Sequence, residues 1–347
     1  MKYNLYNILF LISTISGLKG VPPGRFAHNS IINKKEVWIL GGSQKPDGYN
    51  RTCIQDAGGP IAEGLWKYDI NTKKWQFDEI EFTERRGATL VRNTKKIYMH
   101  GGGVVDGENS FRSIPLADMW EYKNDKWCEI KTNSPPIYAH QSVIDSKNNI
   151  YSLGGLDADG RSGYLHKFNG KEWTKEETPF SEKIDEFGGL MGHTMTLIEN
   201  ELIYVIGGVF GMPIDKNNYN EEVWVYSINT NKWTIVCGGI PLQGHSASKI
   251  ERIKILAGLP YCNDDIIISG GYYPTEDEVN DEGATHLGGT SDNIYCFNTR
   301  RKTWKSVAQL EKPREFHTSV IRNKKLYIYG GYHIGYFWDD MEIIELE

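Results

Sequence analysis

The chain has 347 residues and a formal net charge of −6, with 39% hydrophobic and 24% charged residues. This composition excludes a disordered or collagen-like chain, and the mild acidity argues against a general nucleic-acid binder, which would carry a basic surface. No long apolar run follows the first 20 residues, so we expect no membrane span in the rest of the chain.

The first 20 residues have the features of a secretory signal peptide. Lys2 supplies a positive charge, residues 8–12 begin a short apolar core, and Ser16 and Gly17 are small residues at a suitable cleavage position. We therefore expect a signal peptide over 1–20 and a protein that is secreted or resides in the secretory pathway. A cytoplasmic protein is the alternative.

A repeat organises residues 21–347. A Gly-Gly pair ends a short β-rich run six times, at Gly41-Gly42, Gly101-Gly102, Gly154-Gly155, Gly207-Gly208, Gly270-Gly271 and Gly330-Gly331. A strand with an aromatic residue follows, and in five units a tryptophan comes next, at Trp75, Trp127, Trp173, Trp233 and Trp304. A histidine opens the first strand of five units, at His28, His140, His193, His245 and His317. Each unit therefore predicts four antiparallel strands joined by short turns such as Asn124-Asp125.

Four strands alone cannot bury both faces of their sheet, whereas six such sheets in a ring can, and they leave only short edges. The sequence therefore predicts an all-β fold, a six-bladed β-propeller of four-stranded antiparallel blades. The order Gly-Gly, aromatic residue, tryptophan resembles the kelch repeat family over residues 21–347, so we expect a kelch-type β-propeller. The shared histidine position recurs around the whole ring, which indicates a structural role rather than a catalytic one.

The sixth unit ends with its third strand, because its aromatic position falls at Ile344 and no tryptophan follows. Its fourth strand must come from another segment, and the spacing of the other units places residues 8–18 there. These residues thus have two interpretations, a cleaved signal or the closing strand of the last blade. The apolar run over 8–12 has no counterpart in the other fourth strands and favours the signal.

The long loops are expected on one face of the ring, because the second–third connections and the links between blades emerge on the same side. These loops carry many carboxylates, whereas the tight turns of the other face carry lysines and arginines. Tyr272, Tyr273, Tyr332 and His333 follow Gly-Gly pairs and should lie near the centre of the loop side, where aromatic residues could anchor a partner. We expect a protein or peptide partner of basic character, and no nucleic acid.

No strong catalytic or cofactor-binding motif is present, so we expect a non-enzymatic protein-interaction scaffold without a cofactor. One alternative comes from Glu278, Glu282 and His286, spaced four residues apart. They resemble the iron ligands of the plant nitrile-specifier proteins, which are kelch propellers, although Glu282 stands where that family has aspartate. That resemblance implies an Fe(II)-dependent lyase, whereas a solvated acidic loop is the simpler interpretation and leaves the chain without a metal site.

Five cysteines are scattered without a Cys-x-x-Cys pair, which argues against a zinc ribbon and against a disulfide framework. Cys128 and Cys296 lie in strand-like segments, where we expect buried or half-buried thiols.

Overall fold

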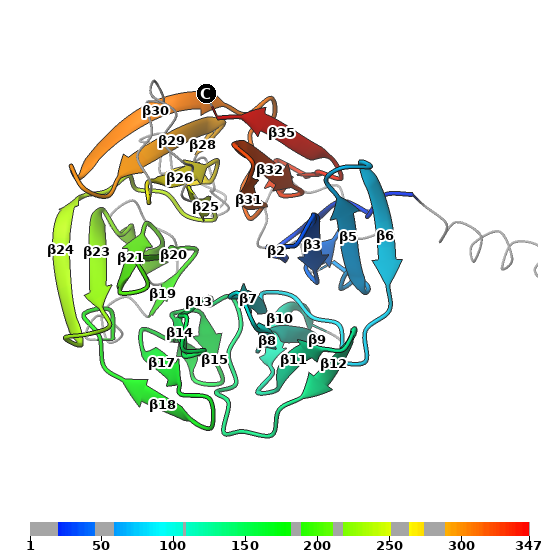
Figure 1. The fold of residues 1–347 in the computed structure, drawn as a ribbon, viewed down its shortest axis with the longest axis horizontal. Coiled ribbons are helices and arrows are strands. Elements are labelled where there is room, and N and C mark those ends of the chain that lie inside the picture. The colour runs from blue at the N-terminus through cyan, green and yellow to red at the C-terminus, as the bar shows by residue number, and fades with distance from the viewer. Residues whose placement is uncertain are drawn as a thin grey trace, which may run out of the picture.

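The computed structural model describes residues 20–45, 59–106, 109–181, 189–210, 218–250, 264–273 and 289–346. Six antiparallel sheets form a ring around a central axis, with the first strand of each sheet innermost (Figure 1). Blade 1 contains β2 (Asn29–Asn33), β3 (Glu36–Leu40), β5 (Leu65–Asp69) and β6 (Lys74–Asp78). Blade 2 contains β7 (Thr89–Arg92), β8 (Ile97–His100), β11 (Met119–Lys123) and β12 (Lys126–Glu129). Blade 3 contains β13 (Gln141–Ile144), β14 (Ile150–Leu153), β17 (Leu165–Phe168) and β18 (Trp173–Glu176).

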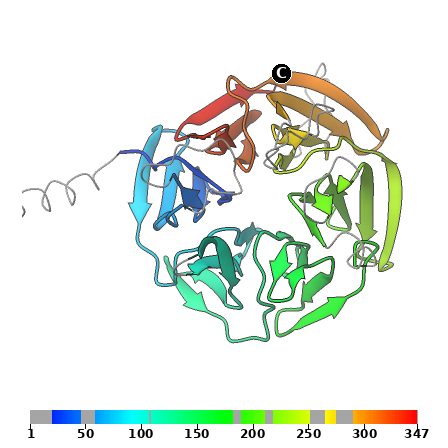
Figure 2. The same ribbon diagram turned by 180° about the vertical axis from the view of Figure 1, so that it is seen from behind.

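The second half of the chain continues the ring, which Figure 2 shows from behind. Blade 4 contains β20 (Thr194–Ile198), β21 (Leu202–Ile206), β23 (Glu222–Ser227) and β24 (Lys232–Gly238). Blade 5 contains β25 (Ser246–Lys249), β26 (Ile266–Ser269), β29 (Asn293–Asn298) and β30 (Thr303–Gln309). Blade 6 contains β31 (Thr318–Arg322), β32 (Lys325–Tyr329) and β35 (Met341–Glu345). The predicted six-bladed, all-β propeller is therefore confirmed.

Six further pairs of short strands lie together on one face of the ring, which we call the loop face. They are β1 (Arg25–Phe26) with β4 (Ser43–Gln44), β9 (Gly103–Asp106) with β10 (Asn109–Pro115), β15 (Leu156–Asp157) with β16 (Gly160–Arg161), β19 (Leu190–Met191) with β22 (Val209–Phe210), β27 (Tyr272–Tyr273) with β28 (Gly289–Thr290), and β33 (Tyr332–His333) with β34 (Tyr336–Phe337). Each Gly-Gly pair leads from a blade into this layer. The tight turns within blades lie on the opposite face, and Asn124 and Asp125 both have positive φ in one of them, as the predicted turn requires.

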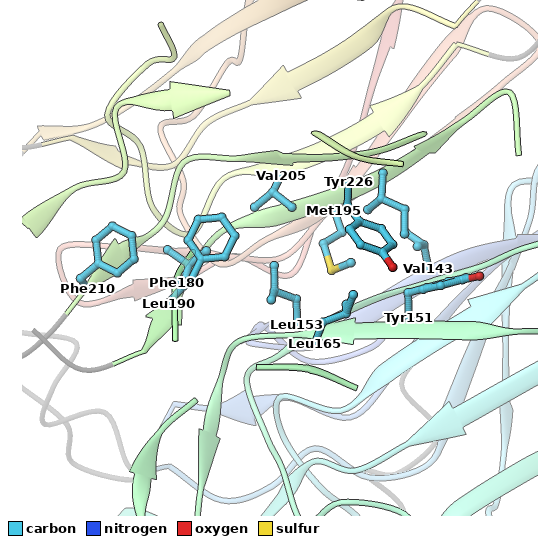
Figure 3. Packing of buried hydrophobic residues seen from close by; sticks show 11 residues of the cluster. Val143, Tyr151, Leu153, Leu165, Phe180, Leu190, Met195, Val205, Phe210 and Tyr226 are labelled. Carbon is cyan, nitrogen blue, oxygen red and sulfur yellow. The ribbon is translucent and has the colours of Figure 1, made fainter. Parts of the chain in front are cut away.

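Burial is greatest in the second strands, which are almost wholly buried, as in β3 and β14. The innermost strands are only partly buried, as in β2, and the fourth strands are mostly exposed, as in β6. Apolar side chains of adjacent blades fill the wedge between them. Figure 3 shows the wedge between blades 3 and 4, where Leu153 and Leu165 lie close to Leu190, Val205 and the link residue Phe180. The repeat tryptophans extend these wedges: the ring of Trp173 in blade 3 stacks on His100 of blade 2, 4.4 Å between centroids.

Three described strands make up blade 6, and Ile344 on β35 faces the wedge with blade 5. Residues 8–18, with their two interpretations as signal or closing strand, lie outside the described residues. Cys296 is buried as expected, but the expectation for Cys128 is wrong. Cys128 is exposed because it follows the buried Trp127 on the outermost strand of its blade and therefore points to solvent. Within the described ranges, no helix is long and apolar enough to cross a membrane.

Candidate functional site

A belt of backbone hydrogen bonds encircles the axis where the chain enters each blade from the loop face. Its residues all have a left-handed backbone, with φ of 51° to 69°: Ala27, Gly87, Ala139, Gly192, Gly244 and Phe316. Five of the six N–H groups donate to the carbonyl of the belt residue in the preceding blade. The distances are 3.1 Å from Ala27 to Phe316, 2.9 Å from Gly87 to Ala27, 2.7 Å from Ala139 to Gly87, 2.8 Å from Gly244 to Gly192 and 2.6 Å from Phe316 to Gly244. Glycine favours this conformation, and the belt ties the inner ends of the blades together.

The repeat histidines follow the belt and join neighbouring blades. Nε2 of His245 lies 2.9 Å from the Thr194 hydroxyl of the preceding blade, and Nε2 of His317 lies 2.9 Å from the Ser269 hydroxyl. Burial lowers the pKa of His245 to about 4 and that of His193 to about 3, so both rings are neutral at physiological pH. These rings line a central cavity of about 290 Å³ together with the belt. Their contacts agree with the structural role inferred from the repeat.

A second ring of side chains, which we call the mouth ring, stands one residue before the belt on the loop face. Its members are Phe26, Arg86, Tyr138, Met191, Gln243 and Glu315. Each pairs with the residue that follows a Gly-Gly pair, so that Gln243 lies beside Tyr272 and Glu315 beside Tyr332. The belt and the histidines repeat around the axis, but the mouth ring has six different side chains. The mouth ring therefore offers six different side chains for specific recognition.

The mouth ring concentrates buried polar groups in blades 4 to 6. Glu315 is 4% exposed, and burial alone raises the pKa of its carboxyl to about 8. Gln243 is 3% exposed; its Nε2 donates to the Tyr219 hydroxyl over 3.3 Å, while its Oε1 has no hydrogen-bond donor among the described residues. Burial also raises the pKa of Tyr219, and the nearby Tyr272 and Glu315 raise it further. Buried polar groups usually have partners, so this cluster calls for an explanation.

The structure brings the predicted Tyr272 and Tyr332 to this cluster. Tyr332 is only 2% exposed and packs edge-on against Phe337, at 5.3 Å between centroids, so it supports the surface from below. Tyr273 is 40% exposed and His333 is half-buried. The candidate metal ligands Glu278, Glu282 and His286 lie outside the described residues. In the described part of the chain, no group of three or more metal-ligating side chains comes together.

Sequence reasoning missed the tip of the β33–β34 hairpin. Ile334 and Gly335 form a two-residue turn with φ of 38° and 81°, and Ile334 is 54% exposed. Tyr336 is 64% exposed, yet its ring stacks on Trp338 with 5.7 Å between centroids and an interplanar angle of 10°. The sequence feature that could have revealed this tip is the apolar residue before Gly335, because two-residue hairpin turns favour asparagine, aspartate or glycine at that position.

Comparisons with known proteins agree with this architecture. The family model of the attractin/LZTR1 β-propeller matches residues 62–339. Kelch-like protein 36 of Rattus norvegicus is 24% identical over 255 residues, which are 70% of this chain and 35% of that protein. Beta-scruin of Limulus polyphemus is 29% identical over 243 residues, 66% of this chain and 23% of that protein. The chain thus spans about a third or less of the length of these relatives.

Two further relatives match a larger share of their own length. A kelch domain-containing protein of Vibrio cholerae is 24% identical over 304 residues, 71% of this chain and 78% of that protein. The solved structure of YjhT superposes with a TM-score of 0.68 at 16% identity and covers 95% of this chain and 97% of that one, which shows a common fold. Together with the six blades and the match over residues 62–339, these likenesses show that the chain is a kelch-type propeller and belongs to the attractin/LZTR1 β-propeller family.

Proposed function

We propose that this protein is a non-enzymatic interaction scaffold that binds a protein partner through the loop face, with the tip of the β33–β34 hairpin as a contact. The kelch-named relatives support a scaffold that serves protein interaction. The observation that carries the choice of surface is the backbone of Ile334. A β-branched residue at φ 38° is strained, and such strain costs on the order of 1–3 kcal/mol. Because Ile334 is largely exposed, packing within the chain does not repay that strain.

The surface around Ile334 suits a partner. Tyr336 is exposed but held against Trp338, so it would lose little conformational freedom on binding. Exposed tyrosines on a firm base are frequent energetic centres of protein interfaces. Tyr273 of the neighbouring blade 5 adds a second exposed aromatic ring on the same face.

The substitution Ile334→Asn tests this proposal, because asparagine tolerates the left-handed backbone. We expect the variant to be more stable than the wild type by about 1 kcal/mol and to bind the partner less well. The full-length protein, with and without the substitution, would capture partners from extract and medium of the native cells for quantitative mass spectrometry. Ile235→Asn on the outer strand β24 is the matched control, since Ile235 is comparably exposed but away from the loop face. Equal capture by all three proteins would contradict the proposal.

We also propose that the protein is secreted and that its partner is extracellular. The support is the apolar segment after Lys2. Mass spectrometry of the N-terminal peptide of the protein from its native cell tests this. A start near Gly17 or Val21 is expected, and an intact N-terminus would instead favour an intracellular scaffold with residues 8–18 as the closing strand.

A further inference from the structure

Three buried side chains from three consecutive blades bring hydrogen-bond acceptors to the neighbourhood of the mouth ring. They are the Glu315 carboxylate, Gln243 Oε1 and the Tyr219 hydroxyl oxygen. Tyr219 connects the other two, because its hydroxyl accepts a bond from Gln243 Nε2 and its phenol interacts electrostatically with Glu315. In the described part of the chain, Gln243 Oε1 receives no hydrogen bond, and the Glu315 side chain beside it is only 4% exposed. Leaving a buried acceptor without a donor is unfavourable, so a ligand that brings donors would be favoured here.

Aromatic rings form the surroundings of these acceptors. The backbone of Tyr272 pairs with that of Gln243, and the backbone of Tyr332 pairs with that of Glu315. Both tyrosine rings are buried. Tyr272 also packs with Tyr219. A cation held next to several aromatic rings gains further attraction from their faces. The site therefore combines one carboxylate, two neutral acceptors and a π-rich wall.

We propose that the mouth ring binds a primary ammonium group, supplied by a lysine side chain of the protein partner. An ammonium is compact and carries three donors, which match the three acceptors, and its single charge matches the single carboxylate of Glu315. A guanidinium would need a planar, bidentate arrangement, and calcium would need six to eight oxygen ligands. This inference rests on the proposed function, because it names the group that the partner inserts beside the hairpin tip.

In the part of the chain that the structure describes, the other charged and titratable groups around Glu315 leave the site open to a cation. Arg86 is the cationic member of the mouth ring, and its guanidinium donates to the hydroxyls of Ser113, at 2.7 Å, and Ser43. Arg314 precedes Glu315 but donates to Glu342 on the outer strand β35. His317 is neutral, since burial holds its pKa well below the usual value. His333 likewise has a pKa lowered by burial.

Among the described residues, the remaining titratable neighbours are phenols. Tyr219 keeps its proton at neutral pH because its pKa is raised, and Tyr272 and Tyr332 complete the set that faces Glu315. Glu315 must ionise to pair with an ammonium, so binding should strengthen as the pH rises through about 8. A lysine amine remains protonated over that range.

The test is calorimetric titration of the full-length protein with the amide of Nα-acetyl-lysine, with its norleucine analogue as the neutral comparison. Binding of the lysine compound alone is expected, with affinity that rises about thirtyfold from about pH 6.5 to about pH 9 as Glu315 ionises. Glu315→Gln should reduce the affinity at least about tenfold, whereas Glu63→Gln, an exposed carboxylate of the loop face, should leave it unchanged. Methylamine and a lysine-containing peptide form two further arms, and tighter binding of the peptide would identify a polypeptide as the source.

Four results would overturn the inference. They are the absence of binding at tens of millimolar lysine amide, equal binding of the norleucine compound, unchanged affinity in Glu315→Gln, and binding of methylamine that a peptide does not improve. The failure of this inference is distinguishable from failure of the proposed function. If only the lysine inference fails, Ile334→Asn loses the captured partner and Glu315→Gln retains it. If the proposed function fails, both variants capture the same proteins as the wild type.

Discussion

Glu315→Gln should stabilise the protein at neutral pH. Burial raises the pKa of the Glu315 carboxyl from 4.5 to about 8, so at neutral pH the group is ionised in the unfolded chain and protonated in the native one. Because the pKa of this carboxyl is higher in the native protein than in the unfolded chain, the native state is most stable below the pKa of the unfolded chain. Its free energy of unfolding falls as the pH rises towards the pKa of the native protein. At about 1.4 kcal/mol per pH unit, the interval from 4.5 to neutrality corresponds to a loss on the order of 3 kcal/mol. Glutamine keeps the shape and cannot ionise, so the variant avoids this loss.

Urea unfolding of both proteins, followed by tryptophan fluorescence from about pH 4.5 to about pH 8, measures the effect. The two free energies of unfolding should coincide at the acidic end and diverge as the pH rises, with Glu315→Gln the more stable. Glu63→Gln serves as the control for a loss of one negative charge at an exposed position and should follow the wild type. A gain that is the same at every pH, or no gain near pH 8, would refute the assignment of a desolvated carboxyl at the mouth ring.

Two pairs of substitutions test the scaffold by the same unfolding assay. Gly154→Ala should destabilise by at least about 3 kcal/mol, because the added Cβ would lie 2.3 Å from the Leu190 carbonyl oxygen of the next blade. Gly170→Ala, in an open turn with φ 93°, should lose only about 1–2 kcal/mol through backbone strain, and equal losses would refute the close packing of blades at the Gly-Gly pair. Arg85→Ala should lose about 3–5 kcal/mol, because the buried guanidinium pairs with Asp118. Lys131→Ala should lower the free energy of unfolding by less than about 1 kcal/mol, because Lys131 is exposed and pairs with Glu129 in solvent. Similar losses in Arg85→Ala and Lys131→Ala would contradict the burial of Arg85.

The blades were predictable from the sequence because each depends on features that recur. Gly-Gly pairs, aromatic residues and tryptophans return at similar spacing, and one interpretation satisfies all six units. The exposed thiol of Cys128 was mistaken because alternation on an outermost strand depends on register, and the buried position is taken by Trp127. The belt could not be foreseen at Phe316, since a bulky residue with left-handed backbone follows no sequence rule and is held there by its bonds to Ala27 and Gly244.

The candidate site was harder to predict for the same reason that the fold was easy. A search for repeated residues passes over positions where the units differ, and the mouth ring differs in every unit. Alignment of the residues just before the belt would have revealed one carboxylate, Glu315, beside the neutral Gln243. Its burial could not be read from the sequence, because it depends on Tyr219 and Tyr332, which the fold brings from other parts of the chain.

Blade 6 contains two places where the local structure works against stability on the loop face. Ile334 has a backbone conformation that asparagine or glycine would adopt with less strain, and Glu315 is a buried carboxyl whose pKa is raised by desolvation. Glutamine at one position and asparagine at the other are single substitutions that physics predicts to stabilise the fold. Conflicts between local preference and the global fold are expected at functional sites, because binding can repay what folding does not. If both substitutions raise stability and both weaken binding, the two positions belong to one interface, in which the hairpin tip provides apolar contact and Glu315 provides charge.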